Sequence, residues 1–304
     1  MQEIYYLVKR NVLTFVRDRA AVFFSVLTML IVLGLMVIFL GDMNSDRVVQ
    51  VLGNIGGERD IERDRENAKY LIQMWTLAGI LVVNTLTVTL TVMGNMVQDE
   101  TRGRLASFYT APVKRIKIAL GYILAAWIVA IVMCLFTLLV GEIYMVAQGN
   151  EWLELVVWLK VTGMIVLNAF VYAALGYLLA MMIHSDSAWS GMLTVIGTLA
   201  GFLGAIYLPM SQLPEGVCSV LKCLPILHGA SMLRTVLTEA AIEETFAGLP
   251  AEAGDIFREE MGVTLFADGN EILMQNQILF VLAYGIIAVI VATLISRRRT
   301  VRDR

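Results

Sequence analysis

The stretch that decides the fold is QDETRGRLASFYTAPVKRIK, residues Gln98 to Lys117. It is a short charged segment with five Lys or Arg residues, and a long apolar run stands on either side of it. Each run has at least the ~20 residues that a helix needs to cross a bilayer core. The segment is therefore predicted to lie at one membrane surface, displayed to whatever is on that side.

The composition excludes an ordinary soluble protein. Of 304 residues, 58% are hydrophobic and 16% are charged, whereas a typical soluble domain has ~25% charged residues. The sequence contains no phosphate-binding loop, dinucleotide motif or nucleophile elbow, and its two His and three Cys have no metal-ligand spacing. We expect a lipid bilayer around the chain, no nucleic acid partner, no metal site, no catalytic residues and no cofactor bound by the chain itself.

Six apolar runs predict six transmembrane helices in an all-α integral membrane protein, a single domain over residues 1–304. The runs are residues 20–41, 75–97, 118–147, 155–183, 190–208 and 276–296. Residues 1–19 form an amphipathic helix suited to the headgroup layer, with a soluble leader helix as the alternative. Its apolar face holds Ile4, Tyr5, Val8, Val12, Phe15 and Val16, and its polar face holds Glu3, Arg10, Thr14, Arg17 and Asp18.

The distribution of Lys and Arg predicts the orientation. With the N-terminus inside, the inner segments carry four basic residues before the first run, five in the 98–117 segment and five after the last run. Because Lys and Arg are enriched in cytoplasmic loops, we predict a multi-pass protein of the cytoplasmic (plasma) membrane with both termini in the cytoplasm.

Residues 209–275 predict a different kind of segment. Their first half is apolar but is interrupted by Pro209, Pro214 and Pro225, which prevents one continuous spanning helix. We predict re-entrant helices there, followed by an acidic, solvated outer cap. Cys218 and Cys223 lie in this segment, and the sequence leaves a disulfide and two free thiols as alternatives.

Two of the runs carry ordered stripes of polar or small residues on one helical face. Such a stripe serves either a substrate path or plain helix packing, and the sequence leaves both open. Glu142, near the end of the third run, is likewise either a snorkelling side chain or a substrate or coupling site. The stripes are Asn84, Thr87, Thr91 and Asn95 in the second run and Thr194, Gly197, Gly201 and Gly204 in the fifth.

Two motifs carry a family resemblance. The first is E-x-x-G-x-L (Glu100, Gly103, Leu105), followed by A-P-V-K-R (111–115) and Gly121. The second is P-x-S-x-L-P, beginning at Pro209, followed by L-P-I around Pro225 and then by Arg234. In this order the motifs resemble the permease subunits of type-2 ABC exporters, six-span permeases without a fused ATPase.

The resemblance implies an ATP-driven exporter. Two permeases, identical or homologous, pair in the membrane, and each is driven by a separate soluble ABC ATPase that binds ATP and Mg²⁺. Residues 1–19 become a connecting helix, and segment 98–112 docks on the ATPase as a coupling helix from Glu100 to Tyr109. The implied coupling residues are Glu100, Arg102, Gly103, Leu105, Phe108 and Tyr109; the re-entrant residues are Pro209, Pro214, Pro225 and Arg234.

The resemblance also implies that substrate passes between the two copies along the stripes of the second and fifth runs. The scarcity of charge in the runs favours a hydrophobic or amphiphilic cargo such as a drug, as in multidrug export, a lipid or a peptide. The alternative is a membrane channel or scaffold that works without an ATPase. An intramembrane enzyme is a third hypothesis, but it requires a paired acid, base or metal constellation that the runs lack.

Overall fold

The structure is a computed structural model that describes residues 2–35, 45–46, 48–50, 52–53, 60–110, 113–267 and 269–298. The end of the predicted first span (36–41), residues 111–112 of the predicted coupling segment and the basic tail after Arg298 lie outside these ranges.

The described chain is almost entirely helical, as the sequence predicts, with one small hairpin that it does not predict. The hairpin pairs Phe266 with Glu271 in antiparallel register. In chain order the elements are α1 (Gln2–Arg17), α2 (Arg19–Leu35), α4 (Ile61–Thr101), α5 (Arg104–Thr110), α6 (Arg115–Ala147), α7 (Leu155–Ala180), α8 (Asp186–Leu203), the 3-10 helix η2 (Met210–Gln212), α9 (Glu215–Lys222), α10 (Pro225–Thr245), α11 (Ala251–Glu260), β1 (Phe266–Ala267), β2 (Asn270–Glu271) and α12 (Met274–Arg298).

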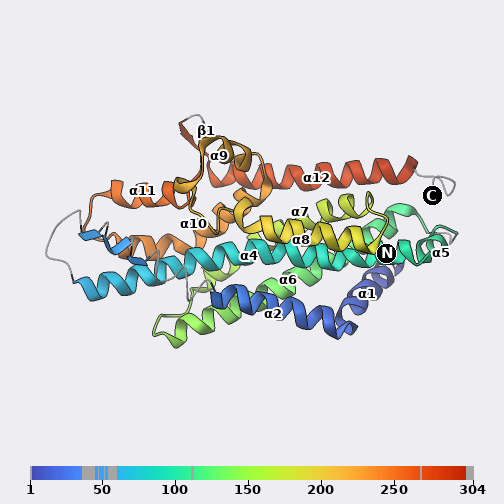
Figure 1. Ribbon diagram of the computed structural model, residues 1–304, viewed down its shortest axis with the longest axis horizontal. Coiled ribbons are helices and arrows are strands. Elements are labelled where there is room, and N and C mark those ends of the chain that lie inside the picture. The colour runs from blue at the N-terminus through green and yellow to red at the C-terminus, as the bar shows by residue number, and fades with distance from the viewer. Residues whose placement is uncertain are drawn as a thin grey trace.

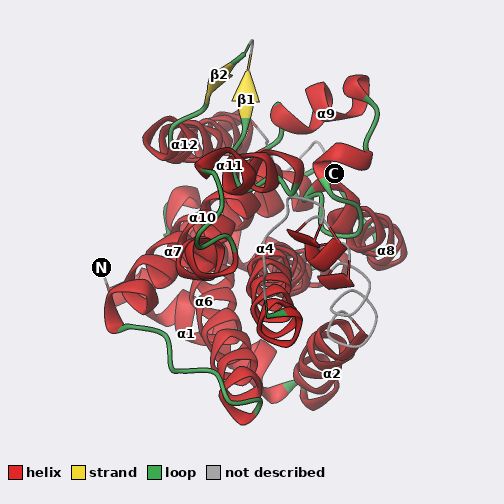
Figure 2. Ribbon diagram, turned by 90° about the vertical axis from the view of Figure 1, so that its left-hand side faces the viewer, coloured by secondary structure: helices red, strands yellow, loops and turns green. Residues whose placement is uncertain are grey.

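Helix α4 is the centre of the bundle. It packs against α6, α7, α8, α10 and α2 (Figures 1 and 2). Within the most apolar 18-residue window of each helix, 72% of α4 is buried but only 22% of α12. Helix α4 therefore forms the protein core, while α12 presents most of its apolar surface outward, where a bilayer would cover it.

The sequence of α4 explains both its start and its continuity. The Asp60 side chain accepts hydrogen bonds from the backbone N–H groups of Glu62 and Arg63, which caps the first turn. Further along, N-T-L-T-V-T-L-T alternates like a strand, yet each Thr hydroxyl donates to the carbonyl four residues earlier; Thr87, for example, donates to Val83 at 2.9 Å. The hydroxyls are satisfied within the helix, so the alternation does not prevent a helix in apolar surroundings.

The number of membrane spans is only partly confirmed. Four described helices are long and apolar enough to cross a membrane: α4, α6, α7 and residues Met274–Ile295 of α12. The pair α9–α10, bent by 88°, makes a fifth if it is counted as one broken span. Helix α8 ends at Leu203, five residues before the predicted limit, because the chain turns at Ala205, whose φ is +50°. The count of six stays a prediction.

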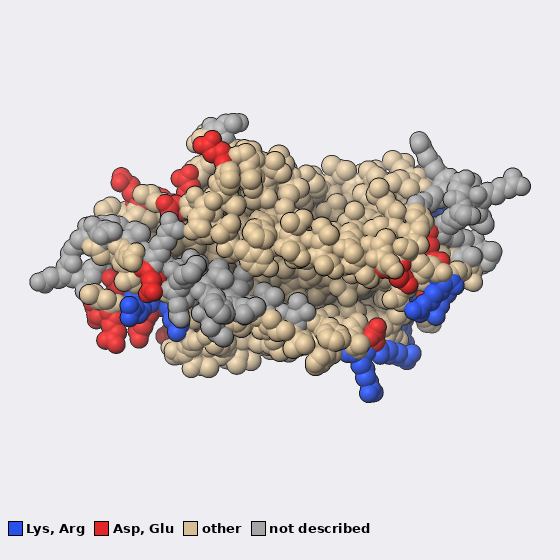
Figure 3. Space-filling model, viewed as in Figure 1, with Lys and Arg blue, Asp and Glu red and all other residues tan. Residues whose placement is uncertain are grey.

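The two ends of the bundle differ in charge. Helix α1, helix α5 and the C-terminal end of α12 lie together at one end, which we call the basic end (Figure 1). Helix α11 and the N-terminal part of α4 lie at the opposite, acidic end. Acidic side chains, with a few basic ones, cluster there, whereas Lys and Arg are prominent at the basic end (Figure 3). Among the described residues visible on this face, a broad band between the ends carries no charge, as expected for a surface in contact with lipid.

The prolines of segment 209–275 lie where helices begin. Pro209 precedes η2, Pro214 precedes α9, and Pro225 is the first residue of α10, a position where its missing N–H costs nothing. The sharp bend between α9 and α10 agrees with the predicted interruption. Helix α10 is longer than the predicted short helices and continues into the acidic half. Cys218 and Cys223 are both free thiols, so the disulfide alternative is wrong.

Candidate functional site

A glycine separates the central helix from the short helix α5. Helix α4 continues through Thr101, and Gly103 then adopts φ +70°, a left-handed conformation that favours glycine. The predicted coupling helix from Glu100 to Tyr109 is therefore wrong at its start. Glu100 lies in the last turn of α4 and Arg102 in the turn, because the apolar run and the polar residues after it form one uninterrupted helix.

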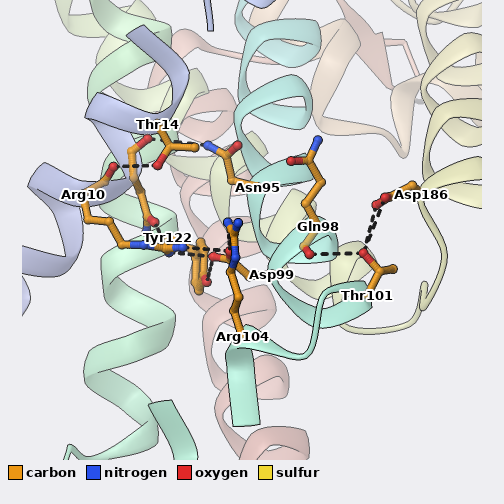
Figure 4. A network of polar contacts seen from close by, with 10 residues as sticks. Arg10, Thr14, Asn95, Gln98, Asp99, Thr101, Arg104, Tyr122 and Asp186 are labelled. Carbon is orange, nitrogen blue, oxygen red and sulfur yellow. Dashed lines mark hydrogen bonds and ion pairs between the residues drawn. The ribbon is translucent and has the colours of Figure 1, made fainter. Parts of the chain in front are cut away.

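Asp99, which the sequence analysis does not single out as a site residue, joins four elements at the basic end (Figure 4). Its carboxylate accepts two hydrogen bonds from the guanidinium of Arg10 on α1, at 2.6 and 2.7 Å. Tyr122 of α6 donates a third at 2.7 Å, and Arg104 at the start of α5 approaches to 3.5 Å. The Asp99 side chain is only 4% exposed. We call Asp99, Arg10, Tyr122 and Arg104 the Asp99 cluster.

Helix α1 is fixed to the bundle by more than this ion pair. The guanidinium of Arg10 also lies 5.1 Å from the centroid of the Phe108 ring on α5. The amide of Asn11 donates to the Gly121 carbonyl at 3.1 Å, and a Cβ on Gly121 would approach the Leu7 Cβ to 2.6 Å. The absence of a side chain at Gly121 therefore allows α1 to lie against α6.

Arg10 departs from the predicted faces of α1. On the apolar face, Phe15 is buried, and Tyr5 and Val16 are 61% and 56% exposed, where a membrane surface would cover them. Arg10, placed on the wet face, is partly buried in the Asp99 cluster. Helical periodicity describes α1 by itself, whereas its orientation is decided by its contacts with α4, α5 and α6.

The predicted coupling residues have different environments. Leu105 is buried in the core and Phe108 is half-buried, so they anchor α5. Arg102 and Gly103 are exposed at the turn. The Glu100 carboxylate lies 3.7 Å from His184 in the α7–α8 connection. Tyr109 belongs to α5, and the structure does not describe its side chain.

A pocket of about 350 Å³ lies between α2, α4 and α8. It brings together four of the eight residues predicted for the substrate path: Asn84, Thr87 and Thr91 of α4, and Gly197 of α8. The predicted stripe of α4 is thus largely the wall of one cavity. The other lining residues are Ala21, Phe24, Ser25, Met29, Ile80, Val83, Val88 and Tyr207.

The remaining stripe residues do not line this pocket. The Asn95 amide donates to the carbonyl of Asn11 at 3.5 Å, towards the basic end. Thr194 is exposed on α8 and donates to its own helix. Gly201 and Gly204 lie against Tyr207 and Ile206, where the chain folds back after α8, so they serve close packing there.

Arg234 of the predicted re-entrant segment is fully buried. Its guanidinium donates to the carbonyls of Gly204 and Ala205 after α8, at 3.0 and 2.8 Å, and to that of Gly262 after α11, at 3.3 Å. The centroid of the Trp75 ring of α4 lies 4.4 Å from the guanidinium carbon. Carbonyls at helix C-termini carry partial negative charge, so Arg234 joins the ends of two helices to the central one.

Glu142 joins helix α6 to the segment that follows it. Its carboxylate accepts hydrogen bonds from the backbone N–H of Leu153 and the indole N–H of Trp158, both at 2.7 Å. Both oxygens are thereby engaged in holding the α6–α7 connection. In the described part of the chain, no group of three His, Cys, Asp or Glu residues is arranged to hold a metal ion.

A comparison with protein families shows the family of the chain. The chain matches the family model described as ABC-2 family transporter protein over residues 58–298. The protein belongs to the ABC-2 transporter family. No curated protein matches it. This ABC-2 protein is accordingly a multi-pass membrane protein of the transporter permease type, and permeases of the family typically work with an ATPase partner.

The sequence of this ABC-2 protein does not by itself reveal the Asp99 cluster at the basic end. Arg10 and Asp99 are 89 positions apart, and no local pattern connects them. The available signal was weak: an Arg on a leader helix and an acid at the end of an apolar run. Their pairing depends on how α1 folds back against α4 and α6.

Proposed function

We propose that the protein is the membrane-spanning permease subunit of an ATP-driven ABC exporter. The observation that carries this proposal is the presentation of α5 at the basic end. Leu105 and Phe108 anchor it to the bundle, the Asp99 cluster ties its first residue to α1, α4 and α6, and Arg104 remains 53% exposed on its side chain. A helix that is anchored on one side and open on the other suits docking by a soluble partner.

In this proposal the basic end faces the cytoplasm of a plasma membrane, because basic residues favour that side. Both termini are cytoplasmic, α2 and α8 complete six spans, and α5 with its flanking turn docks on a soluble ABC ATPase. ATP and Mg²⁺ bind to that partner. A second copy or homologue faces the pocket between α2, α4 and α8. ATP-driven closure of the ATPases favours the outward-open state of the spans only to the extent that the ATPases bind that state better.

The proposed cargo is hydrophobic or amphiphilic: a drug, a lipid or a peptide. The wall chemistry of the α2–α4–α8 pocket supports this class, since apolar side chains surround a few hydroxyl and amide groups there. Its volume is in the range of small-molecule sites in proteins. A channel or scaffold that needs no ATPase is the rival function.

Purification of the tagged full chain from the membranes of its own cells tests the proposal. We expect an ABC ATPase to copurify and to hydrolyse ATP. Ser107→Trp, an exposed position on α5, should abolish this association, while Ser219→Trp, exposed on α9 away from the basic end, should retain it (Figure 1). If the purified chain carries no ATPase and conducts ions alone in planar bilayers, the channel hypothesis replaces the exporter.

A further inference from the structure

The pocket between α2, α4 and α8 has a defined polarity. Asn84, Thr87 and Thr91 stand at positions i, i+3 and i+7 of α4, so they form one stripe that is roughly 10 Å long at 1.5 Å per residue. The facing wall, from α2, is largely apolar and includes Phe24 and Met29. Among the described residues that line the pocket, none carries a charge.

The hydroxyl hydrogens of the stripe are already donated to carbonyl groups of the same helix. The Thr87 hydroxyl donates to the Val83 carbonyl at 2.9 Å, and the Thr91 hydroxyl donates to the Thr87 carbonyl at 2.8 Å. Each hydroxyl oxygen retains acceptor capacity, because a hydroxyl has one hydrogen and two lone pairs. The two threonines therefore face the pocket as hydrogen-bond acceptors.

Asn84 extends the same polarity. Its amide nitrogen donates to the Thr137 hydroxyl at 2.6 Å, and that hydroxyl donates in turn to the Met133 carbonyl at 2.9 Å. This chain fixes the orientation of the amide, because the Thr137 hydrogen is already used. The Asn84 carbonyl oxygen remains as the third acceptor in the stripe.

We infer that this pocket binds an uncharged, elongated amphiphile whose polar edge carries hydrogen-bond donors, such as hydroxyl or amide N–H groups, and that it rejects anions. The inference rests on the proposed function and narrows its substrate class. An anion in the pocket would lose its hydration and gain no basic side chain. The Ser25 and Tyr207 hydroxyls in the lining are too few donors to replace that hydration, so the loss is costly. A permanent cation would likewise find no carboxylate in the described lining. A neutral donor-bearing ligand meets the acceptors and leaves the apolar wall for its hydrocarbon part.

Four probes with the same dodecyl chain test this inference: a primary amide, a methyl ester, a carboxylate and a trimethylammonium. The full chain is placed in phosphatidylcholine nanodiscs, and the binding of tritiated amide is measured with the other three probes as competitors. We expect the amide to bind at least tenfold tighter than the ester, and the two charged probes to compete weakly. The ester reports the apolar contribution, because it lacks a donor.

Thr87→Val and Thr91→Val remove the acceptors while conserving shape. Each should weaken amide binding by about fivefold, the equivalent of one net hydrogen bond of about 1 kcal/mol, and should leave ester binding unchanged. Thr293→Val on α12 is the matched control, since Thr293 also donates to the carbonyl four residues earlier but does not line the pocket. Its amide binding should equal that of the unaltered protein.

Three results would overturn the inference. The first is a carboxylate that binds as tightly as the amide. The second is an amide preference that survives both valine substitutions. The third is equal competition by the three competitor probes, or no binding of the amide at all, which would make the pocket a site for lipid chains or a surface covered by the second copy. Copurification of the ATPase decides the exporter function separately, so the two can fail independently.

Discussion

Replacement of Asp99 by Asn should release helix α1 from the bundle. Asn has nearly the same shape as Asp, but it carries no charge and cannot accept both hydrogen bonds of the Arg10 fork. The substitution leaves the guanidinium of Arg10 partly buried against Phe108 without its counter-ion, and Tyr122 must compete for one remaining oxygen. Arg10 is then better solvated when α1 detaches.

The burial of the pair gives the magnitude. Loss of one partner from a fully buried ion pair costs roughly 3–5 kcal/mol, whereas an exposed pair contributes about 0–1 kcal/mol. The Asp99 side chain is 4% exposed and that of Arg10 is 31% exposed. An intermediate cost of about 2–3 kcal/mol follows. At ~1.4 kcal/mol per factor of ten, this raises the detached population of α1 by about 30- to 150-fold.

Hydrogen–deuterium exchange of the full chain in nanodiscs measures this population through the protection of the α1 amides. Glu3→Gln is the matched control. The Glu3–Lys117 pair also joins α1 to α6 at 2.6 Å, but the Glu3 side chain is 47% exposed whereas that of Asp99 is 4% exposed, so its loss should change protection little. Adding Arg10→Gln to Asp99→Asn should restore part of the protection, because the uncompensated charge disappears.

Asp99 does not hold α1 in place if Asp99→Asn reduces protection no more than Glu3→Gln does. The same conclusion follows if the Arg10→Gln substitution brings no recovery in the double variant. In either case the Asp99 cluster would be incidental, and the packing of Leu7 on Gly121 would carry the attachment of α1.

Three further predictions concern stability, each measured by thermal unfolding of the solubilised full chain. Gly103→Ala should lower the free energy of unfolding by about 1–2 kcal/mol, because φ is +70° at this residue. Gly191→Ala on α8, where the space around the glycine is open, should not lower it. Equal effects of the two substitutions would contradict the strained turn. Arg234→Met should lower the free energy of unfolding by about 3 kcal/mol, because several buried carbonyls lose their donor. An unchanged unfolding temperature would show that Arg234 does not hold these helix ends. Glu142→Gln should cost about 2 kcal/mol, because an amide hydrogen would face a donor; a loss of transport at unchanged stability would instead make Glu142 a transport residue.

Several features of the site could be predicted because they depend on neighbours in the sequence. The stripe Asn84, Thr87, Thr91 follows from helical spacing, and the structure places all three on one cavity wall. The interruption of the helix at Pro214 and Pro225 was predicted because proline cannot continue a helix interior. The start of α5 could not be predicted from the sequence. A polar stretch after an apolar run indicates a new element as readily as the continued helix that α4 forms.

By itself, the sequence determined that this chain is a helical membrane protein with a charged segment at one surface, because apolar length and helical periodicity are local properties. Only the tertiary structure decided which side chains meet. Asp99 contacts α1 because that helix returns Arg10 to it from 89 positions away, and Glu142 holds the α6–α7 connection because a loop N–H and an indole N–H donate to its carboxylate. Burial and partners fix the role of a charged group, and both depend on how distant segments pack.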